Sequence, residues 1–269
     1  MKEYDIHTHT LYCDGKNSPR EMVEAAYNLG FSAIGLSGHS YTPFDDSYCM
    51  SLGNTAKYID EINKLKEDFK GRLHVLCGIE QDYFAPLPDY KYDYMIGSVH
   101  YVEVDGKRLT IDYKPEETQT IIDTYFGGSY DALAESYFNL VGNILEVTGA
   151  DIIGHFDLIS KFSEVMNYHE SPKYLDAGYE AIRKLIPYGK PFEINVGAMT
   201  RGYRTSPYPS AAFMSEILRL GGKITVTGDC HSVESLGKGL DAGYDFARRC
   251  GFTSVMVMTP DGFQETPLF

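Results

Sequence analysis

Six of the eight histidines in the sequence stand at or just beyond the ends of short apolar or β-branched runs. They are His7, His9, His39, His100, His155 and His231. Two acidic residues, Glu80 and Asp229, occupy equivalent positions at the ends of such runs. Neutral imidazole nitrogens and carboxylate oxygens suit zinc, manganese or iron. These side chains therefore predict a metal centre, whereas His74 and His169 lie elsewhere and are expected to be structural or solvated.

Two of the strand ends carry pairs of candidate ligands separated by one residue. DIHTHT contains His7 and His9, and GDCH contains Asp229 and His231. Side chains at positions i and i+2 of a strand point to the same side, so each pair can reach one ion. An isolated pair of this kind need not bind a metal, because a histidine at a strand end is more often a hydrogen-bonded residue. The agreement among six strand ends nevertheless favours a metal site. The candidates exceed the roughly four ligands of a tetrahedral ion, so we expect two or three divalent ions with bridging carboxylates.

Neighbouring divalent ions supply the chemistry that hydrolysis of a phosphoester needs. They lower the pKa of a shared water molecule and neutralise the charge of an anionic substrate. We expect a hydroxide that bridges two ions to attack phosphorus in line, without a nucleophilic cysteine or serine. The leaving alkoxide would take its proton from a metal-bound water or from a side chain at the rim, with Asp229 and His231 as the nearest candidates.

Parallel strands must carry these side chains if they are to meet. Apolar runs predict strands over residues 3–9, 32–39, 72–80, 92–100, 150–156, 190–196 and 223–231, with 252–258 as a candidate eighth. Helical spacing predicts helices over 20–30, 55–70, 115–126, 129–147, 171–186, 209–222 and 232–251. This alternation predicts a parallel α/β sheet closed into a TIM-like barrel, in which the carboxyl ends of the strands share one rim. No low-complexity linker interrupts the chain, so residues 1–269 are expected to form one domain.

The composition limits the classes of partner. The net charge of −14, from 38 acidic and 24 basic residues, repels phosphate backbones, so nucleic acid is not expected as a partner. An acidic surface suits cations, although it also serves solubility alone. The sequence has neither an 18-residue apolar run nor a signal-peptide hydrophobic region, so no membrane span and no export are expected. Five cysteines without a CxxC pair favour reduced thiols, as in the cytoplasm. The oligomeric state stays open.

Six short motifs together resemble a known family. HTHT, GHS, GIE, SVH, IGHFD and GDCH, in this order between Asp5 and about Gly239, resemble the PHP (polymerase and histidinol phosphatase) superfamily. The single-domain length and the segments IGHFDLISKF and FEINVGAMTRGYRTSPYPS are similar to its stand-alone histidinol-phosphate phosphatases of histidine biosynthesis. The resemblance implies a distorted (β/α)7 barrel with three metals. It also implies hydrolysis of L-histidinol phosphate to L-histidinol and phosphate.

The resemblance further implies how three ions would share the candidate ligands. The first ion would be held by His7, His9, Glu80 and Asp229. Glu80 would bridge to a second ion held with His100 and His155, and the third would be held by His39 and His231. In many family members the loop after the HxH motif supplies one more histidine, and here Asp14 occupies that place. A carboxylate can substitute for the histidine, but an aspartate before a glycine is also a common turn residue.

Basic residues of two loops are the candidate contacts of the phosphate group. Related sequences often have arginine at the position of Ser160, beside Lys161. Arg201 and Arg204, in GAMTRGYR, follow the sixth predicted strand. The guanidinium fork matches phosphate oxygens in two places, although any of these side chains could be a solvated loop charge.

Three other functions remain compatible with the sequence. The first is a phosphoesterase of the same family that acts on another monoester or on a nucleotide. The second is an amidohydrolase-like C–N hydrolase, which also carries HxH on its first strand. Such enzymes generally lack the additional pair that His39 and His231 supply here. The third is a metal-binding protein without turnover.

Overall fold

The computed structural model describes residues 4–269, and a seven-stranded parallel sheet forms its centre. The strands, in spatial order, are β1 (Tyr4–Asp5), β2 (Ala33–Leu36), β3 (His74–Asp82), β4 (Tyr94–Ser98), β7 (Ile152–Ile153), β8 (Phe192–Asn195) and β9 (Ile224–Thr227). Beyond the ends of β1 and β9, Thr8 and Cys230 form a parallel bridge. The His9 N–H donates to the Cys230 carbonyl (2.9 Å) and the Cys230 N–H to the His7 carbonyl (3.2 Å). The sheet is therefore a nearly closed, distorted TIM-like barrel, as predicted, although residue 3 of the first predicted strand lies outside the described residues.

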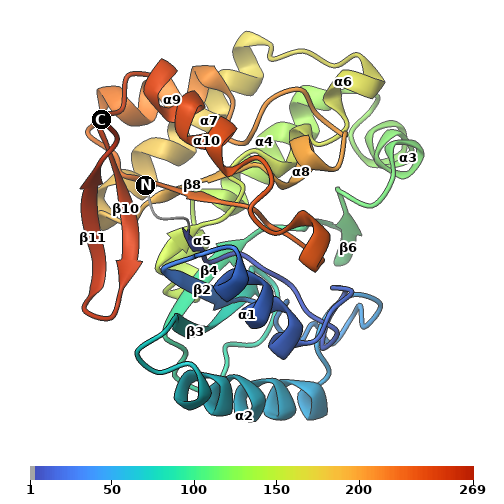
Figure 1. The fold of residues 1–269 in the computed structure, drawn as a ribbon. Helices are drawn as coiled ribbons and strands as arrows, with labels where there is room; N and C mark the ends of the chain where they lie inside the picture. Colours follow the sequence, from blue (N-terminus) through green and yellow to red (C-terminus); the bar gives the residue numbers. More distant parts are fainter. Residues whose placement is uncertain (1–3) are drawn as a thin grey trace.

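Helices cover the outside of this barrel (Figure 1). The first ones are α1 (Pro19–Asn28), α2 (Leu52–Asp68), α3 (Pro115–Tyr125), α4 (Tyr130–Val141) and α5 (Ile144–Thr148). They are followed by α6 (Ser163–Met166), α7 (Pro172–Leu185), α8 (Gly197–Thr200), α9 (Ala211–Arg219) and α10 (Leu240–Arg249). Helices α1 and α2 pack against β2 and β3, whereas α10 packs against β8 and β9.

The first predicted helix, α1, begins with a capping box. Ser18 is the N-cap, and its hydroxyl accepts from the Glu21 N–H (3.3 Å) while the Glu21 carboxylate accepts from the Ser18 N–H (2.8 Å). Pro19 follows at the first helical position, where its missing N–H costs no hydrogen bond.

Two predicted helices differ from the observed ones. The helix expected over 129–147 is interrupted between α4 and α5, where the Asn143 side chain donates to the Asn139 carbonyl (2.8 Å). Such a side-chain bond competes with the helical backbone pattern. The helix expected over 232–251 begins only at Leu240, because Gly237 and Gly239 have φ angles of 78° and 81°, outside the right-handed helical region.

The candidate eighth strand is not part of the barrel. Residues 254–259 form β10 (Ser254–Thr259), which pairs antiparallel with β11 (Gly262–Pro267) in a separate hairpin. A second hairpin, β5 (Tyr101–Val104) and β6 (Lys107–Thr110), was not predicted. Its turn is Asp105–Gly106, with φ angles of 51° and 73°, the Asp-Gly signal of a tight hairpin turn.

Aromatic packing fills the barrel below its functional rim. Tyr94 is 1% exposed, and its hydroxyl donates to the Ile6 carbonyl (2.5 Å). A Cβ at Gly35 or Gly78 would overlap the Tyr94 ring, so these glycines make room for it. The interior is thus solid beneath the strand ends that carry the candidate ligands.

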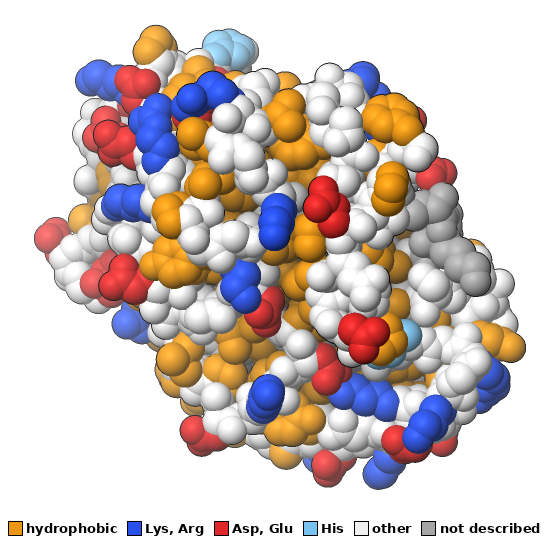
Figure 2. All heavy atoms as spheres, turned by 90° about the vertical axis from the view of Figure 1, so that its left-hand side faces the viewer, with side chains coloured by type: hydrophobic (Ala, Val, Ile, Leu, Met, Phe, Trp, Pro, Cys, Tyr) orange, Lys and Arg blue, Asp and Glu red, His pale blue; other side chains and the backbone are white. Residues whose placement is uncertain are grey.

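The outer surface is mixed in charge on the face that carries the β10–β11 hairpin. Lys and Arg side chains alternate there with Asp and Glu, and apolar side chains are exposed between them (Figure 2). Among residues 4–269, no helix has the length and apolar character needed to cross a membrane.

Candidate metal centre

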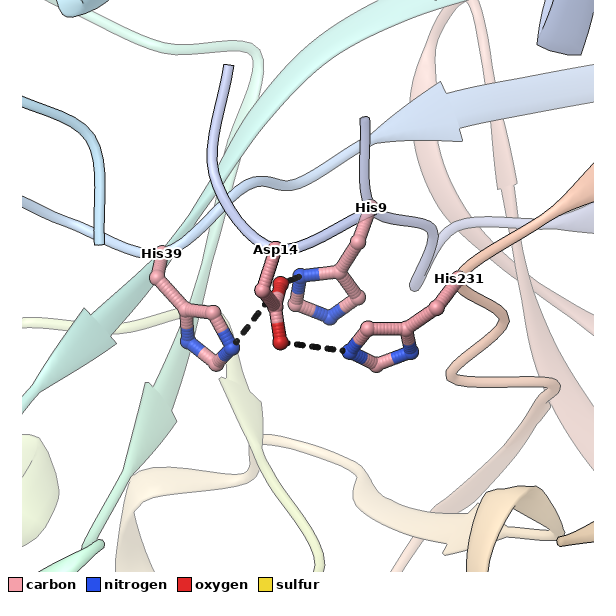
Figure 3. A group of neighbouring side chains, drawn as sticks. All are labelled: His9, Asp14, His39 and His231. Atoms are coloured by element: carbon pink, nitrogen blue, oxygen red, sulfur yellow. Dashed lines mark hydrogen bonds and ion pairs between the residues drawn. The ribbon is translucent and has the colours of Figure 1, made fainter. Parts of the chain in front are cut away.

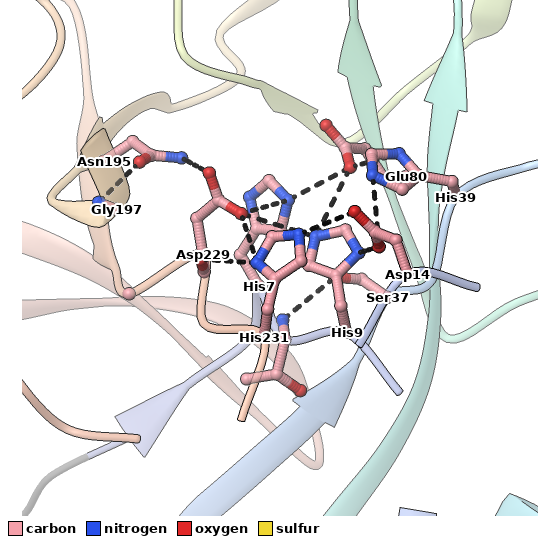
Figure 4. Close-up of polar contacts among 12 residues, drawn as sticks. His7, His9, Asp14, Ser37, His39, Glu80, Asn195, Gly197, Asp229 and His231 are labelled. Carbon is pink, nitrogen blue, oxygen red and sulfur yellow. Dashed lines mark hydrogen bonds and ion pairs between the residues drawn. The ribbon is translucent and has the colours of Figure 1, made fainter. Parts of the chain in front are cut away.

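The carboxylate of Glu80 contacts a buried group of five histidines, of which His7, His9 and His39 are drawn with it in Figure 4. Its Oε2 is 3.3 Å from His7 Nε2, 3.6 Å from His9 Nε2 and 2.9 Å from His39 Nδ1. Its Oε1 is 3.3 Å from His100 Nε2 and 2.9 Å from His155 Nε2. The two oxygens therefore face different histidines, which is the arrangement that a bridging carboxylate needs.

Three overlapping groups of side chains have ligand atoms within 4.8 Å of one another. They are His7, His9 and Asp229; His39, Glu80 and His100; and His9, Asp14, His39 and His231. His155 joins them through Glu80. The structure thus brings every side chain that was predicted as a ligand into one continuous cluster at the carboxyl ends of the strands.

Unpartnered buried atoms at the centre of this cluster test whether a metal ion fits. His7 Nε2, His9 Nε2 and Glu80 Oε2 are buried and have no hydrogen-bond partner among the described residues. Asp229 Oδ1 completes the set, 3.9 Å from the His7 nitrogen and 3.4 Å from the His9 nitrogen. Buried polar atoms without partners are costly, and two imidazole nitrogens with two carboxylate oxygens form a donor set for a divalent transition ion. The residues fit such an ion.

Asp14 lies in the cluster, in the loop that follows His9. Its carboxylate is 3.0 Å from His231 Nε2, 3.4 Å from His9 Nδ1 and 3.7 Å from His39 Nε2 (Figure 3). Gly15 allows this approach, because a Cβ there would overlap the backbone of His9 and Thr10. The side chain of Asp14 therefore points among three histidines.

Opposite charges hold these groups in their ionised forms. Burial alone would raise the pKa of Glu80, but His39, His7 and His100 outweigh it and hold that pKa well below its usual range. Burial likewise would lower the pKa of His39, but Glu80 and Asp14 outweigh it and raise that pKa to about 9. A metal ion, which binds neutral imidazole, must displace protons from this cluster.

The raised pKa of His39 predicts how the metal-free protein responds to pH. Protonation of His39 contributes stability that is complete below the unfolded-state pKa of about 6.5 and is lost as the pH rises through about 9. We expect the melting temperature of metal-free protein to fall by several degrees between pH 6.5 and 9. Metal-loaded protein should show a much smaller change, because bound ions replace the protons. Calorimetry of both forms checks this, and a melting temperature that rises over this range in metal-free protein would contradict it.

A cavity of about 680 Å³ opens beside the cluster. Arg201 and Lys161 line it, together with four tyrosines, Tyr48, Tyr101, Tyr113 and Tyr203. Arg201 donates to the Asp229 carbonyl (2.7 Å) and to Asp229 Oδ2 (3.2 Å). Lys161 Nζ donates to the carbonyl of Asp112 (2.6 Å) and lies 3.2 Å from its carboxylate. The sequence pattern did not indicate a role for the tyrosines, which lie on separate loops and strands.

Arg204 does not line the cavity. Its guanidinium donates to the Ser160 hydroxyl and lies 4.6 Å from the centre of the Tyr208 ring. It is 9% exposed, and burial, which would lower its pKa, is outweighed by the attraction of Asp157. This placement favours Arg201 over Arg204 as the arginine that meets a ligand.

The two remaining histidines lie away from the cluster, as predicted. His74 begins β3, at the opposite end of the strand from Glu80, and lines a separate hollow of about 830 Å³. His169 is exposed in the loop before α7.

Comparisons with known proteins identify the family and the fold of the chain. The PHP domain family matches residues 5–197. A probable histidinol-phosphatase of Schizosaccharomyces pombe is 26% identical over 287 residues, covering 95% of this chain and 90% of that protein. The histidinol-phosphatase of Bacillus subtilis is 26% identical over 274 residues, covering 93% and 100%. The structure of histidinol phosphate phosphatase from Lactococcus lactis, complexed with zinc, L-histidinol and phosphate, has a TM-score of 0.72 at 20% identity and covers 98% of this chain and 99% of that one.

Proposed function

The chain belongs to the PHP domain family, and we propose from this that it is a metal-dependent histidinol-phosphatase. The reaction is hydrolysis of L-histidinol phosphate to L-histidinol and phosphate. The observation that carries the proposal is the position of Glu80 among five histidines, beside a cavity that also presents Arg201. Relatives named histidinol-phosphatase that align over nearly the whole chain support the choice of substrate.

Two or three divalent ions, with zinc, manganese and iron as the candidates, would be held by the cluster. We assign one ion to His7, His9, Glu80 and Asp229; one to Glu80, His100 and His155; and one to Asp14, His39 and His231. Bound there, such ions activate water for attack on phosphorus and neutralise phosphate charge.

The residues around the cluster orient the phosphate group and handle protons. Arg201 is the proposed phosphate contact. It lines the cavity, and its hydrogen bond to Asp229 places the guanidinium next to the proposed metal centre. Lys161 is the second candidate, because it lines the same cavity, where it pairs with Asp112. We keep Asp229 and His231 as candidates for proton transfer to the leaving alkoxide. Burial would raise the pKa of Asp229, but Arg201 and His7 hold it well below its usual range, so this carboxylate is ionised and would have to take up a proton before it could pass one on.

The remaining wall of the cavity suits the organic half of the proposed substrate. Asp45 and the rings of Tyr48, Tyr101 and Tyr113 face the same space. Histidinol phosphate carries an ammonium group, which a carboxylate and aromatic faces attract, and an imidazole ring, which can stack against an aromatic face.

A panel of substrates tests the proposed function. Metal-loaded protein, with its ions counted by elemental analysis, is assayed with L-histidinol phosphate, simple alkyl phosphates, a nucleoside monophosphate and a cyclic amide. We expect kcat/KM for L-histidinol phosphate to exceed that for the other phosphate esters by at least about 100-fold, a difference of about 2.7 kcal/mol. Preference for another monoester would show that the protein is a phosphatase with a different substrate. Hydrolysis of the amide alone would overturn the proposal.

A further inference from the structure

Strand β8 differs from the other six strands of the barrel in the residues at its carboxyl end. The ends of the other strands supply the cluster residues, whereas the end of β8 supplies none of those proposed as ligands. Instead β8 carries two polar side chains, Glu193 and Asn195, which are 0% exposed. They are separated by one residue, so both point to the same side of the strand.

The carboxylate of Glu193 receives four contacts, two on each oxygen. Oε1 lies 2.5 Å from His7 Nδ1 and accepts from the Thr227 hydroxyl (2.6 Å). Oε2 accepts from the backbone N–H of His155 (2.6 Å) and from the Asn195 amide (3.1 Å). Glu193 therefore touches two of the proposed ligand residues and points at no open space.

The same network reaches a third proposed ligand residue. Asn195 Nδ2 also lies 3.2 Å from Asp229 Oδ2, and Asn195 Oδ1 accepts from the Gly197 N–H (2.9 Å). The bond from Gly197 fixes which end of the Asn195 amide is the oxygen. The amide must then present its N–H groups to Glu193 and Asp229.

We propose that Glu193 is a positioning residue that fixes the tautomer of His7 and thereby its ability to bind a metal ion. When His7 Nδ1–H donates to Glu193, the lone pair is on Nε2. That nitrogen faces Glu80 and Asp229 and has no hydrogen-bond partner among the described residues. Carboxylates that hold the far nitrogen of a metal-binding histidine orient the ring and raise its basicity. The inference rests on the proposed metal centre.

The contacts of Glu193 predict that glutamine cannot replace it. The backbone N–H of His155 and the fixed Asn195 amide can only donate, so the oxygen of Gln in place of Glu193 must face them. The NH₂ group would then face His7 Nδ1. His7 would have to accept there, which moves its proton to Nε2, the nitrogen that is needed for the metal. Thr227 does not prevent this, because a hydroxyl can rotate to accept.

Zinc affinity of the Glu193→Gln variant tests the proposal. Metal-free wild type and variant are titrated with zinc against a chelator, and their thermal unfolding is followed without metal. We expect zinc affinity at the tightest site to fall by about 10- to 100-fold in a protein that still unfolds cooperatively. Glu216→Gln is the matched control, because Glu216 is 9% exposed but lies on α9 with arginine partners. Its zinc affinity should equal that of wild type, and a loss of less than about tenfold in Glu193→Gln would overturn the proposal.

A spectroscopic measurement on wild type decides the question even if the variant does not fold. In zinc-loaded protein with ¹⁵N-labelled histidine, we expect the His7 ring to carry a proton on Nδ1 that exchanges slowly and to bind zinc through Nε2. Zinc on Nδ1, or an unprotonated Nδ1, would overturn the assignment. Neither measurement needs turnover, so a wild type that leaves L-histidinol phosphate intact would refute the proposed function separately.

Discussion

The Glu80→Gln variant is expected to lose about 1,000-fold or more in kcat for L-histidinol phosphate and to bind fewer ions per chain. In wild type the Glu80 carboxylate contacts histidines with both oxygens. Glutamine offers one neutral oxygen and an NH₂ group that repels a cation. Loss of a metal-ion contribution of several kcal/mol corresponds to a decrease of this size. Elemental analysis and phosphate release, measured on the same sample, check the two effects together.

The control for this variant must separate loss of the ions from loss of the fold. Glu216→Gln makes the same chemical change on α9 and should keep both its ions and its activity. The comparison uses only variant protein whose circular dichroism spectrum matches that of wild type, because removing Glu80 leaves the surrounding histidines without their counter-charge. Full activity with a full complement of ions would contradict the assignment of Glu80 as a bridging ligand.

Replacing Arg201 by methionine is expected to reduce kcat/KM for L-histidinol phosphate by about 100- to 1,000-fold, since a charged fork aimed at the transferring phosphoryl group is lost. Methionine keeps much of the side-chain length while removing the charge. Inorganic phosphate should also become a weaker inhibitor. Steady-state kinetics with and without added phosphate measure both effects.

Arg201 also donates to Asp229, so its variant needs a readout that separates the two roles. The number of bound ions should stay close to that of wild type, because the cluster residues that we assign as ligands are retained. Arg183→Met, at an exposed position on α7, is the control and should change neither quantity. Equal kinetic constants for Arg201→Met and Arg183→Met would show that Arg201 does not contact the substrate.

The barrel and the histidine cluster were predictable because both follow from rules that act along a single strand. Apolar runs that end in histidine or a carboxylate place their polar ends at one rim as soon as the strands are parallel. Open parallel sheets share the same alternation of strands and helices, and the bridge between Thr8 and Cys230 that closes this sheet is visible only in the structure. Gly237 and Gly239 delay the start of the last helix for a reason that is also local, and the sequence pattern alone overestimated the length of that helix.

The supporting residues could not be predicted, because their partners are distant in sequence. Glu193 meets His7 past the intervening strand β9, and nothing near residue 193 indicates that contact. Arg201 and Arg204 have the same chemistry three residues apart, yet the first turns to Asp229 and the second packs on the Tyr208 ring. The spacing GAMTRGYR does not distinguish them, and the tertiary packing does.

The central claim is that phosphate release from L-histidinol phosphate depends on ions held around Glu80. Its most direct test is a stepwise return of zinc or manganese to metal-free wild type, with ions per chain and phosphate release measured at each step. We expect no release above background without metal, and release that rises only as the second and any third ion bind. Full turnover by protein from which the ions have been removed, as verified by elemental analysis, would contradict the claim.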